Sequence, residues 1–166
     1  MTQDINGPDG LVIESAAEGT LAGWLAVHNE LIPNATLTSA QARDRLARHQ
    51  LLVALRGGQV VGGTTVRPPD DEPSVVTVIV RVRPAHQGVG IGSLLFQRAM
   101  EQAVAFDPTR IKTCVLASNE RGMSFALRRG FIEVDRYVLD GDDVPFVDLA
   151  HPAPRTLLAR RQPGSR

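Results

Sequence analysis

The chain has 166 residues, of which 43% are apolar and 22% are charged, and its formal net charge is zero. These values are typical of one soluble globular domain, which we place at residues 1–150. Zero net charge argues against nucleic-acid binding through phosphate contacts, and no apolar run reaches the roughly 18 residues of a transmembrane helix. The one cysteine, Cys114, cannot form an intramolecular disulfide, and no metal-ligand spacing surrounds it, so we expect no metal. The N-terminus lacks the basic and apolar regions of a signal peptide, so we expect a cytoplasmic protein.

The first part of the chain alternates short apolar runs with helical patterns. Thr38 and Gln41 have the spacing of a capping box, which predicts the start of a helix. The residues Arg-Gly-Gly-Gln between two apolar runs are typical of a β-hairpin turn. We therefore expect a strand at residues 11–13, helices at 18–32 and 38–49, and strands at 51–55 and 60–66.

The middle of the chain contains its most informative stretch. Apolar and β-branched residues predominate at positions 74–83, which predicts a strand near the centre of a sheet. Gly88, Gly90 and Gly92 follow a proline, and a long helical pattern begins at Ile91. Backbone N–H groups at a helix start have no intrahelical partners, and glycine lets a ligand approach them. The stretch is therefore typical of a phosphate-binding turn.

The last part of the chain predicts a further strand, a helix and a hairpin with an Asp-Gly-Asp-Asp turn. The expected elements are a strand at 111–116, a helix at 119–129, and strands at 131–139 and 144–149. Residues 151–166 include four arginines and no acidic residue. We expect this segment to be a flexible basic tail or a linker to another module, with a functional basic arm as the alternative.

Two common phosphate-binding motifs do not fit the glycine spacing. A dinucleotide-binding fold needs G-x-G-x-x-G directly after its first strand, whereas the glycines here are spaced G-x-G-x-G and come after a hairpin. A Walker loop needs Gly-Lys-Ser or Gly-Lys-Thr, and the sequence contains neither. The phosphate ligand is therefore of another kind.

The sequence resembles the GNAT superfamily of N-acetyltransferases. The pyrophosphate motif of that family is R/Q-x-x-G-x-G/A after a V-x-P strand end, and here Val82-Arg83-Pro84 precedes Gln87-x-x-Gly90-x-Gly92. The next family motif is an Asn followed by a helix that ends in Gly-Phe, and here these are Asn119 and Gly130-Phe131. The resemblance covers residues 11–149. It implies an α+β fold with a mixed, mostly antiparallel central sheet of about seven strands, about four flanking helices and splayed central strands.

The resemblance also implies acetyl-CoA as co-substrate. It implies that the pantetheine arm lies between the splayed strands, bonded to backbone of Val80–Val82, and that the pyrophosphate binds the N–H groups of the glycine loop. Asn119 would contact the pantetheine side. The expected cofactor-binding residues are Val80, Arg81, Val82, Gln87, Gly88, Val89, Gly90, Ile91, Gly92, Ser93 and Asn119.

Two catalytic positions depart from the family pattern. The Tyr that often protonates the leaving CoA thiolate is replaced by Ala126, and the Glu that serves as a base in many protein N-terminal acetyltransferases is replaced by Cys114. We name Tyr137 and His28 as candidate catalytic residues. Packing is the alternative for both, because a strand Tyr or a His on an apolar helix face is commonly structural.

The expected function is transfer of an acetyl group from acetyl-CoA directly to the amine of a small molecule. A protein N-terminus is a less favoured acceptor, because the usual base is absent. The alternative is a GNAT-fold sensor or accessory module that binds acyl-CoA with little or no turnover. We expect a small-molecule amine as partner, no nucleic acid and no membrane, and we leave a homodimer open.

Overall fold

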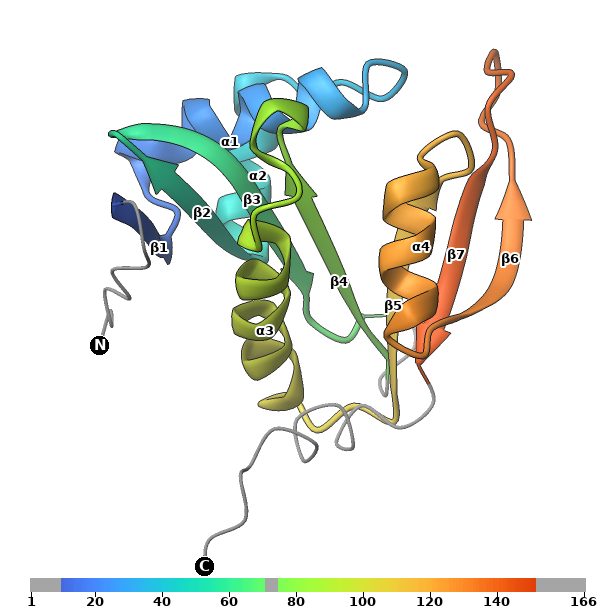
Figure 1. Cartoon of the computed structure of the whole chain (residues 1–166). Coiled ribbons are helices and arrows are strands. Elements are labelled where there is room, and N and C mark those ends of the chain that lie inside the picture. The colour runs from blue at the N-terminus through green and yellow to red at the C-terminus, as the bar shows by residue number, and fades with distance from the viewer. Residues whose placement is uncertain (1–9, 71–74, 152–166) are drawn as a thin grey trace, which may run out of the picture. The chain divides into compact units, whose positions relative to one another are not determined.

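The computed structural model describes residues 10–70 and 75–151. Its elements follow the predicted order. They are β1 (Leu11–Ser15), α1 (Glu18–Leu31), α2 (Ser39–Arg48), β2 (Gln50–Arg56), β3 (Gln59–Arg67), β4 (Val75–Val82), the 3-10 turn η2 (Pro84–His86), α3 (Ile91–Val104), β5 (Arg110–Leu116), α4 (Glu120–Arg128), β6 (Ile132–Tyr137) and β7 (Phe146–His151). The strands pair in the order β1-β2-β3-β4-β5-β7-β6 (Figure 1). This mixed sheet with four α-helices confirms the predicted α+β fold.

Most element boundaries lie within a residue or two of the predicted ones. The main differences are in the last hairpin, where β6 ends at Tyr137 and β7 begins at Phe146. Pro145 precedes β7, and its carbonyl accepts a hydrogen bond from the Ala117 amide at 2.9 Å, outside the β5–β7 ladder. The predicted tail at residues 152–166 lies outside the described residues.

The described chain forms two compact units. The first comprises residues 10–67 and 79–99, and the second comprises residues 68–70, 75–78 and 100–151. In the first unit, alternate residues of β2 enter two apolar clusters on opposite faces of the sheet. Leu51 and Val53 pack with Trp24 under α1 and α2, whereas Leu52 packs with Leu95 of α3. The sheet of this unit is therefore covered on both faces.

The β2–β3 hairpin has the turn that its sequence predicts. Gly57 and Gly58 have φ angles of +58° and +78°, and Arg56 pairs with Gln59. Positive φ at both central residues is the geometry whose twist matches that of the paired strands, and glycine adopts it without steric strain. The turn therefore fixes the pairing at this end of the hairpin, and an irregularity at Ala54/Leu55 shifts the register beyond it.

The capping box predicted for α2 is present. The Gln41 amide donates to Thr38 Oγ1 at 3.2 Å, and the Thr38 amide donates to Gln41 Oε1 at 2.9 Å. These two bonds satisfy backbone donors that the helix itself leaves without partners. The sequence thus specifies where α2 begins.

Replacing Thr38 by Ala is expected to lower the free energy of unfolding by about 1 kcal/mol, because the side-chain acceptor of the cap is lost. Urea unfolding followed by circular dichroism measures the change. Thr36→Ala, an exposed position before the cap, serves as the control. An equal effect of both substitutions would contradict the role of the cap.

In the second unit, β7 pairs with β5 on one side and β6 on the other, and α4 packs on β5. Val147 and Leu149 are fully buried, whereas the apolar residues of β6 remain largely exposed, with Ile132 at 59%. β6 is the last strand in the pairing order. The second unit thus has its core between β5, β7 and α4.

The parallel pairing of β4 with β5 is short. It joins Val75–Thr77 to Arg110–Lys112, and no further pairs of these two strands occur among the described residues. β4 has eight residues and β5 has seven, so most of each strand lies beyond the ladder. The paired part of β4 is therefore its first three residues.

Candidate active site

The first unit presents a strand, a tight loop and a helix start in sequence. β4 ends at Val82, whose carbonyl accepts a hydrogen bond from Gln87 Nε2 at 2.9 Å. The side chain of Gln87 therefore closes the turn η2 back onto the end of the strand. Gly88 and Gly90 follow with φ angles of +81° and +92°, which side chains rarely adopt. Gly88 and Gly90 are thus required by the backbone of the loop, whereas Gly92 lies within α3.

The loop leads directly into α3, whose first hydrogen bond runs from the Leu94 amide to the Gly90 carbonyl at 3.1 Å. The amides before Leu94 stand at the start of the helix, where a helix supplies no acceptor for its first N–H groups. Val89 is 63% exposed, so the loop is open to solvent. The geometry is that of an anion site made of backbone donors and the positive end of the helix dipole.

The strand before this loop supplies an apolar wall. Val82 is buried among residues that include Ile91 and Leu95, and Val80 packs against the same cluster. Because strand side chains alternate, Arg81 lies on the opposite face of β4. Arg81 itself is half-buried.

Asn119 lies in the second unit and caps α4. Its Oδ1 accepts a hydrogen bond from the Gly122 amide at 2.9 Å. A Cβ on Gly122 would lie 2.6 Å from Asn119 Nδ2, so the glycine makes room for this cap. The cap uses the Oδ1 acceptor of Asn119. The predicted contact of Asn119 with the cofactor stays a prediction.

The two departures from the family pattern are both visible in the second unit. Ala126 is 4% exposed in α4, so its methyl group belongs to the core and offers no proton. Cys114 lies on β5 opposite Asp148 of β7 and is half-buried. Neither position supplies the acid or the base of the usual arrangement.

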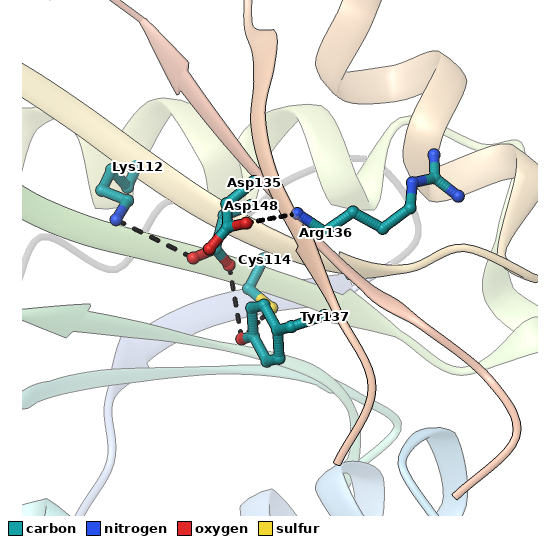
Figure 2. A network of polar contacts seen from close by, with 6 residues as sticks. All are labelled: Lys112, Cys114, Asp135, Arg136, Tyr137 and Asp148. Carbon is teal, nitrogen blue, oxygen red and sulfur yellow. Dashed lines mark hydrogen bonds and ion pairs between the residues drawn. The ribbon is translucent and has the colours of Figure 1, made fainter.

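Tyr137 joins a polar network with Cys114 (Figure 2). Its hydroxyl lies 3.6 Å from Cys114 Sγ and donates to Asp148 Oδ1 at 3.4 Å, which is a long hydrogen bond. Lys112 Nζ lies 3.8 Å from Asp148 Oδ2, and the Tyr137 ring stacks on Phe146 with centroids 5.9 Å apart. Because a carboxylate only accepts, the phenol hydrogen points to Asp148.

This environment affects the proton of Tyr137. Partial burial raises the pKa of the phenol, and the contacts with Cys114 and the carboxylate of Asp148 raise it further. The phenol therefore stays protonated at neutral pH. It can donate a hydrogen bond or a proton, but it cannot act as a base there.

Sequence reasoning named Tyr137 but missed Lys112 and Asp148. Lys112 and Cys114 share one face of β5 by strand alternation, which the sequence does show. The pairing of Cys114 with Asp148 depends on the β5–β7 register. These two strands are separated by a helix and another strand, so no local signal fixes that register.

His28 lies on the buried face of α1. The residue is 8% exposed, its ring stacks on Trp24 with the centroids 5.9 Å apart, and its Nε2 lies 3.0 Å from the Ala35 carbonyl oxygen. Because a carbonyl only accepts, Nε2 carries the hydrogen. Burial and, to a lesser extent, the charges of nearby arginines lower the pKa of His28 to about 4, against the hydrogen bond to the Ala35 carbonyl, which raises it. These contacts favour a structural histidine, and its predicted role as a base stays a prediction.

His28 should make stability depend on pH. Its pKa falls from 6.5 to about 4 on folding, so the unfolded chain takes up the proton first as the pH falls. Native stability is therefore complete above pH 6.5 and declines toward pH 4, by up to about 3 kcal/mol. We expect His28→Gln to show a smaller decline in urea unfolding between pH 7 and 4. An equal decline of the free energy of unfolding in both proteins would mean that folding does not lower the pKa of His28.

The comparison with protein families decides the classification. Residues 24–131 match the model of the acetyltransferase (GNAT) family. The chain belongs to the GNAT acetyltransferase family. Acetyl-CoA-dependent acetyl transfer is the general activity of GNAT proteins. The match spans both the glycine loop and Asn119, so it includes each motif on which the predicted resemblance depended.

Solved GNAT structures share the fold. An N-acetyltransferase from Staphylococcus aureus Mu50 is 19% identical with a TM-score of 0.72, over 86% of this chain and 98% of that one. The Salmonella typhimurium protein yncA, solved with its cofactor acetyl-CoA, is 19% identical with a TM-score of 0.71, over 86% and 93%. A ribosomal-protein-alanine N-acetyltransferase from Brucella melitensis is 23% identical with a TM-score of 0.70, over 85% and 99%. No curated protein matches the sequence significantly.

Two further observations concern the described part of this GNAT chain. Among residues 10–70 and 75–151, no three His, Cys, Asp or Glu side chains gather as they would around a metal ion. No helix in these ranges has the length and apolar character needed to cross a membrane.

Proposed function

We propose that this GNAT protein transfers an acetyl group from acetyl-CoA directly to the amine of a small molecule. The observation that carries the proposal is the loop of the first unit, where Gly88 and Gly90 at positive φ present the amides that begin α3. Such a loop suits the pyrophosphate of CoA. The membership of the family supports acetyl-CoA as the donor.

The cofactor would bind through backbone groups. We assign the pyrophosphate to the amides of residues 88–93, and the pantetheine arm to the backbone of Val80–Val82 as an added strand. Gln87 holds this arrangement, because its side chain bonds the end of β4. Asn119 is proposed to contact the pantetheine with its amide group.

The proposed reaction has no covalent enzyme intermediate. A neutral amine attacks the thioester carbon, and the carbonyl oxygen gains negative charge that the backbone N–H groups near Val82 can stabilise. The C–S bond then breaks, the CoA sulfur leaves as a thiolate, and the attacking nitrogen releases a proton to water. The thiolate takes up a proton, and we assign its donor to Tyr137, since Ala126 cannot serve. Tyr137 then regains a proton from water.

The assignment of Tyr137 predicts a loss of kcat in Tyr137→Phe. We expect kcat to fall roughly tenfold to a hundredfold, less than for many general acids because a CoA thiol is a good leaving group. The KM for acetyl-CoA should stay near its original value. Val138→Ala, at a neighbouring exposed position, is the control. An unchanged kcat in Tyr137→Phe would remove this residue from the chemistry.

A second candidate function is binding of acyl-CoA without turnover, as a sensor or accessory module. The buried methyl group of Ala126 at the usual acid position favours it. The two functions separate in one experiment. Acetyl-CoA binding is measured by calorimetry, and release of free thiol is then followed across a panel of small amines. Turnover with any amine supports the transferase, whereas binding without turnover supports the sensor.

A further inference from the structure

Five basic side chains gather in the first unit, and we call them the basic cluster: Arg45, Arg67, Arg81, His28 and His49. Their positions follow from the backbone. Gln50 pairs with Val66, so His49 and Arg67 are neighbours across the ends of β2 and β3. Arg45 is one helical turn before His49, whose amide donates to the Arg45 carbonyl at 2.8 Å.

His28 and Arg81 join this group from α1 and β4. The charges of Arg81, Arg45 and Arg67 all act on His28, and the charge of Arg67 also acts on Arg45. α1 lies over this face of the sheet, because Trp24 reaches within 2.8 Å of where a Cβ on Gly63 would be. Four separate elements thus direct basic groups to one region.

The carboxylate that acts on Arg45 and His49 is shared with another arginine. Asp44 is the carboxylate that acts on Arg45 and His49, and it is already bonded to Arg48. Buried Arg67 Nε, His28 Nδ1 and His49 Nδ1 have no hydrogen-bond partner among the described residues. Partly buried like charges and buried polar atoms without partners both raise the free energy of a fold. An anion in this region would relieve both.

The basic cluster adjoins the backbone that we assign to the cofactor. Val80 and Val82 pack in the apolar core under α3. Arg81 lies between them in the strand, so it points to the opposite face, which α1 covers. The pantetheine arm is proposed to bond the same three residues. A group held by the basic cluster would therefore lie beside the segment that carries the thioester, where an acceptor must approach.

We propose that the acceptor amine carries an oxyanion, a carboxylate or a phosphate, and that the basic cluster binds it. This inference rests on the proposed acetyltransferase function. Arginine suits the role, because its planar guanidinium donates two parallel hydrogen bonds to a carboxylate or phosphate. Arg67 is the central member, since its charge acts on His28, Arg45 and His49 alike. Free amino acids and aminoalkyl phosphates are the two sources of such amines.

The test compares matched acceptors with the full-length protein and acetyl-CoA. Free amino acids are compared with their carboxamides, and phosphoethanolamine with ethanolamine, by thiol release. We expect kcat/KM to be at least roughly tenfold higher for the anionic member of one of these pairs. The neutral member cannot accept a charge-assisted hydrogen bond, and the loss of one such bond has about this effect. The pair that shows the preference identifies the oxyanion.

Variants connect the preference to the basic cluster. Arg67→Gln and Arg45→Gln should each lower kcat/KM for the anionic acceptor while acetyl-CoA affinity is kept, and Arg67→Lys should restore part of the loss. Arg43→Gln, at an exposed residue 3.7 Å from Glu18, is the control. Equal rates for charged and neutral acceptors, or no effect of the cluster variants, would overturn this inference alone. Turnover with no amine at all would overturn it together with the transferase function.

Discussion

A Gly90→Val protein is expected to bind acetyl-CoA at least about tenfold more weakly than the original protein. Gly90 has a φ of +92°, and forcing a β-branched residue into that conformation costs about 1–3 kcal/mol. A Cβ there would meet nothing within 4 Å, so the strain is in the backbone and not in packing. The loop should change conformation to relieve the strain. The amides that begin α3 would then no longer be arranged to bind the pyrophosphate together. Calorimetric titration with acetyl-CoA measures the loss.

Gly141→Val provides a matched control. Gly141 has a φ of +86°, and a Cβ there would also meet nothing within 4 Å. It lies in the β6–β7 turn, so the substitution introduces similar backbone strain outside the glycine loop. We expect similar losses of stability for both variants, and weaker cofactor binding for Gly90→Val alone. Equal affinities of the two variants would place the pyrophosphate elsewhere.

The largest effect on stability is expected for Trp24→Ala, at about 4 kcal/mol. Trp24 is 3% exposed, and its Nε1 donates to the Thr64 carbonyl at 3.2 Å. Its ring packs against Gly63 and stacks on His28, so its removal leaves a cavity between α1 and the sheet. Urea unfolding followed by circular dichroism measures the loss without relying on tryptophan fluorescence.

Two further variants separate the contributions of Trp24. Trp24→Phe keeps most of the ring and loses the hydrogen bond, so we expect a loss of about 1–2 kcal/mol. Leu127→Ala removes an apolar side chain that is 51% exposed, and should change stability by less than about 0.5 kcal/mol. A Trp24→Ala protein as stable as Leu127→Ala would show that α1 is not part of the core.

Sequence patterns predicted the features that depend on residues close together in the chain. The Gly57–Gly58 turn needs positive φ, and the Thr38 cap needs an acceptor three residues before Gln41. The glycine loop could also be predicted, because the end of the strand, the turn and the start of the helix are contiguous in the sequence. In each case the residues that form the sequence pattern are the same residues that stabilise the local structure.

Features that join distant segments could not be predicted in this way. Tyr137 was a candidate by its type alone, and its contacts with Cys114 and Asp148 depend on strands paired across long connections. The basic cluster was not predicted, because Arg45, Arg67 and Arg81 are scattered in the sequence. The hydrophobic pattern sets which face each strand buries, but it does not set which strands become neighbours.

The sequence by itself determined the fold family, the order of elements and the glycine loop proposed to hold CoA. Local backbone requirements and short motif spacings carry that information. Tertiary structure alone decided that Ala126 is buried without a proton to give, that Tyr137 donates toward Asp148, and that Arg67 lies beside His49. Packing and strand register bring these groups together, and both depend on the whole chain.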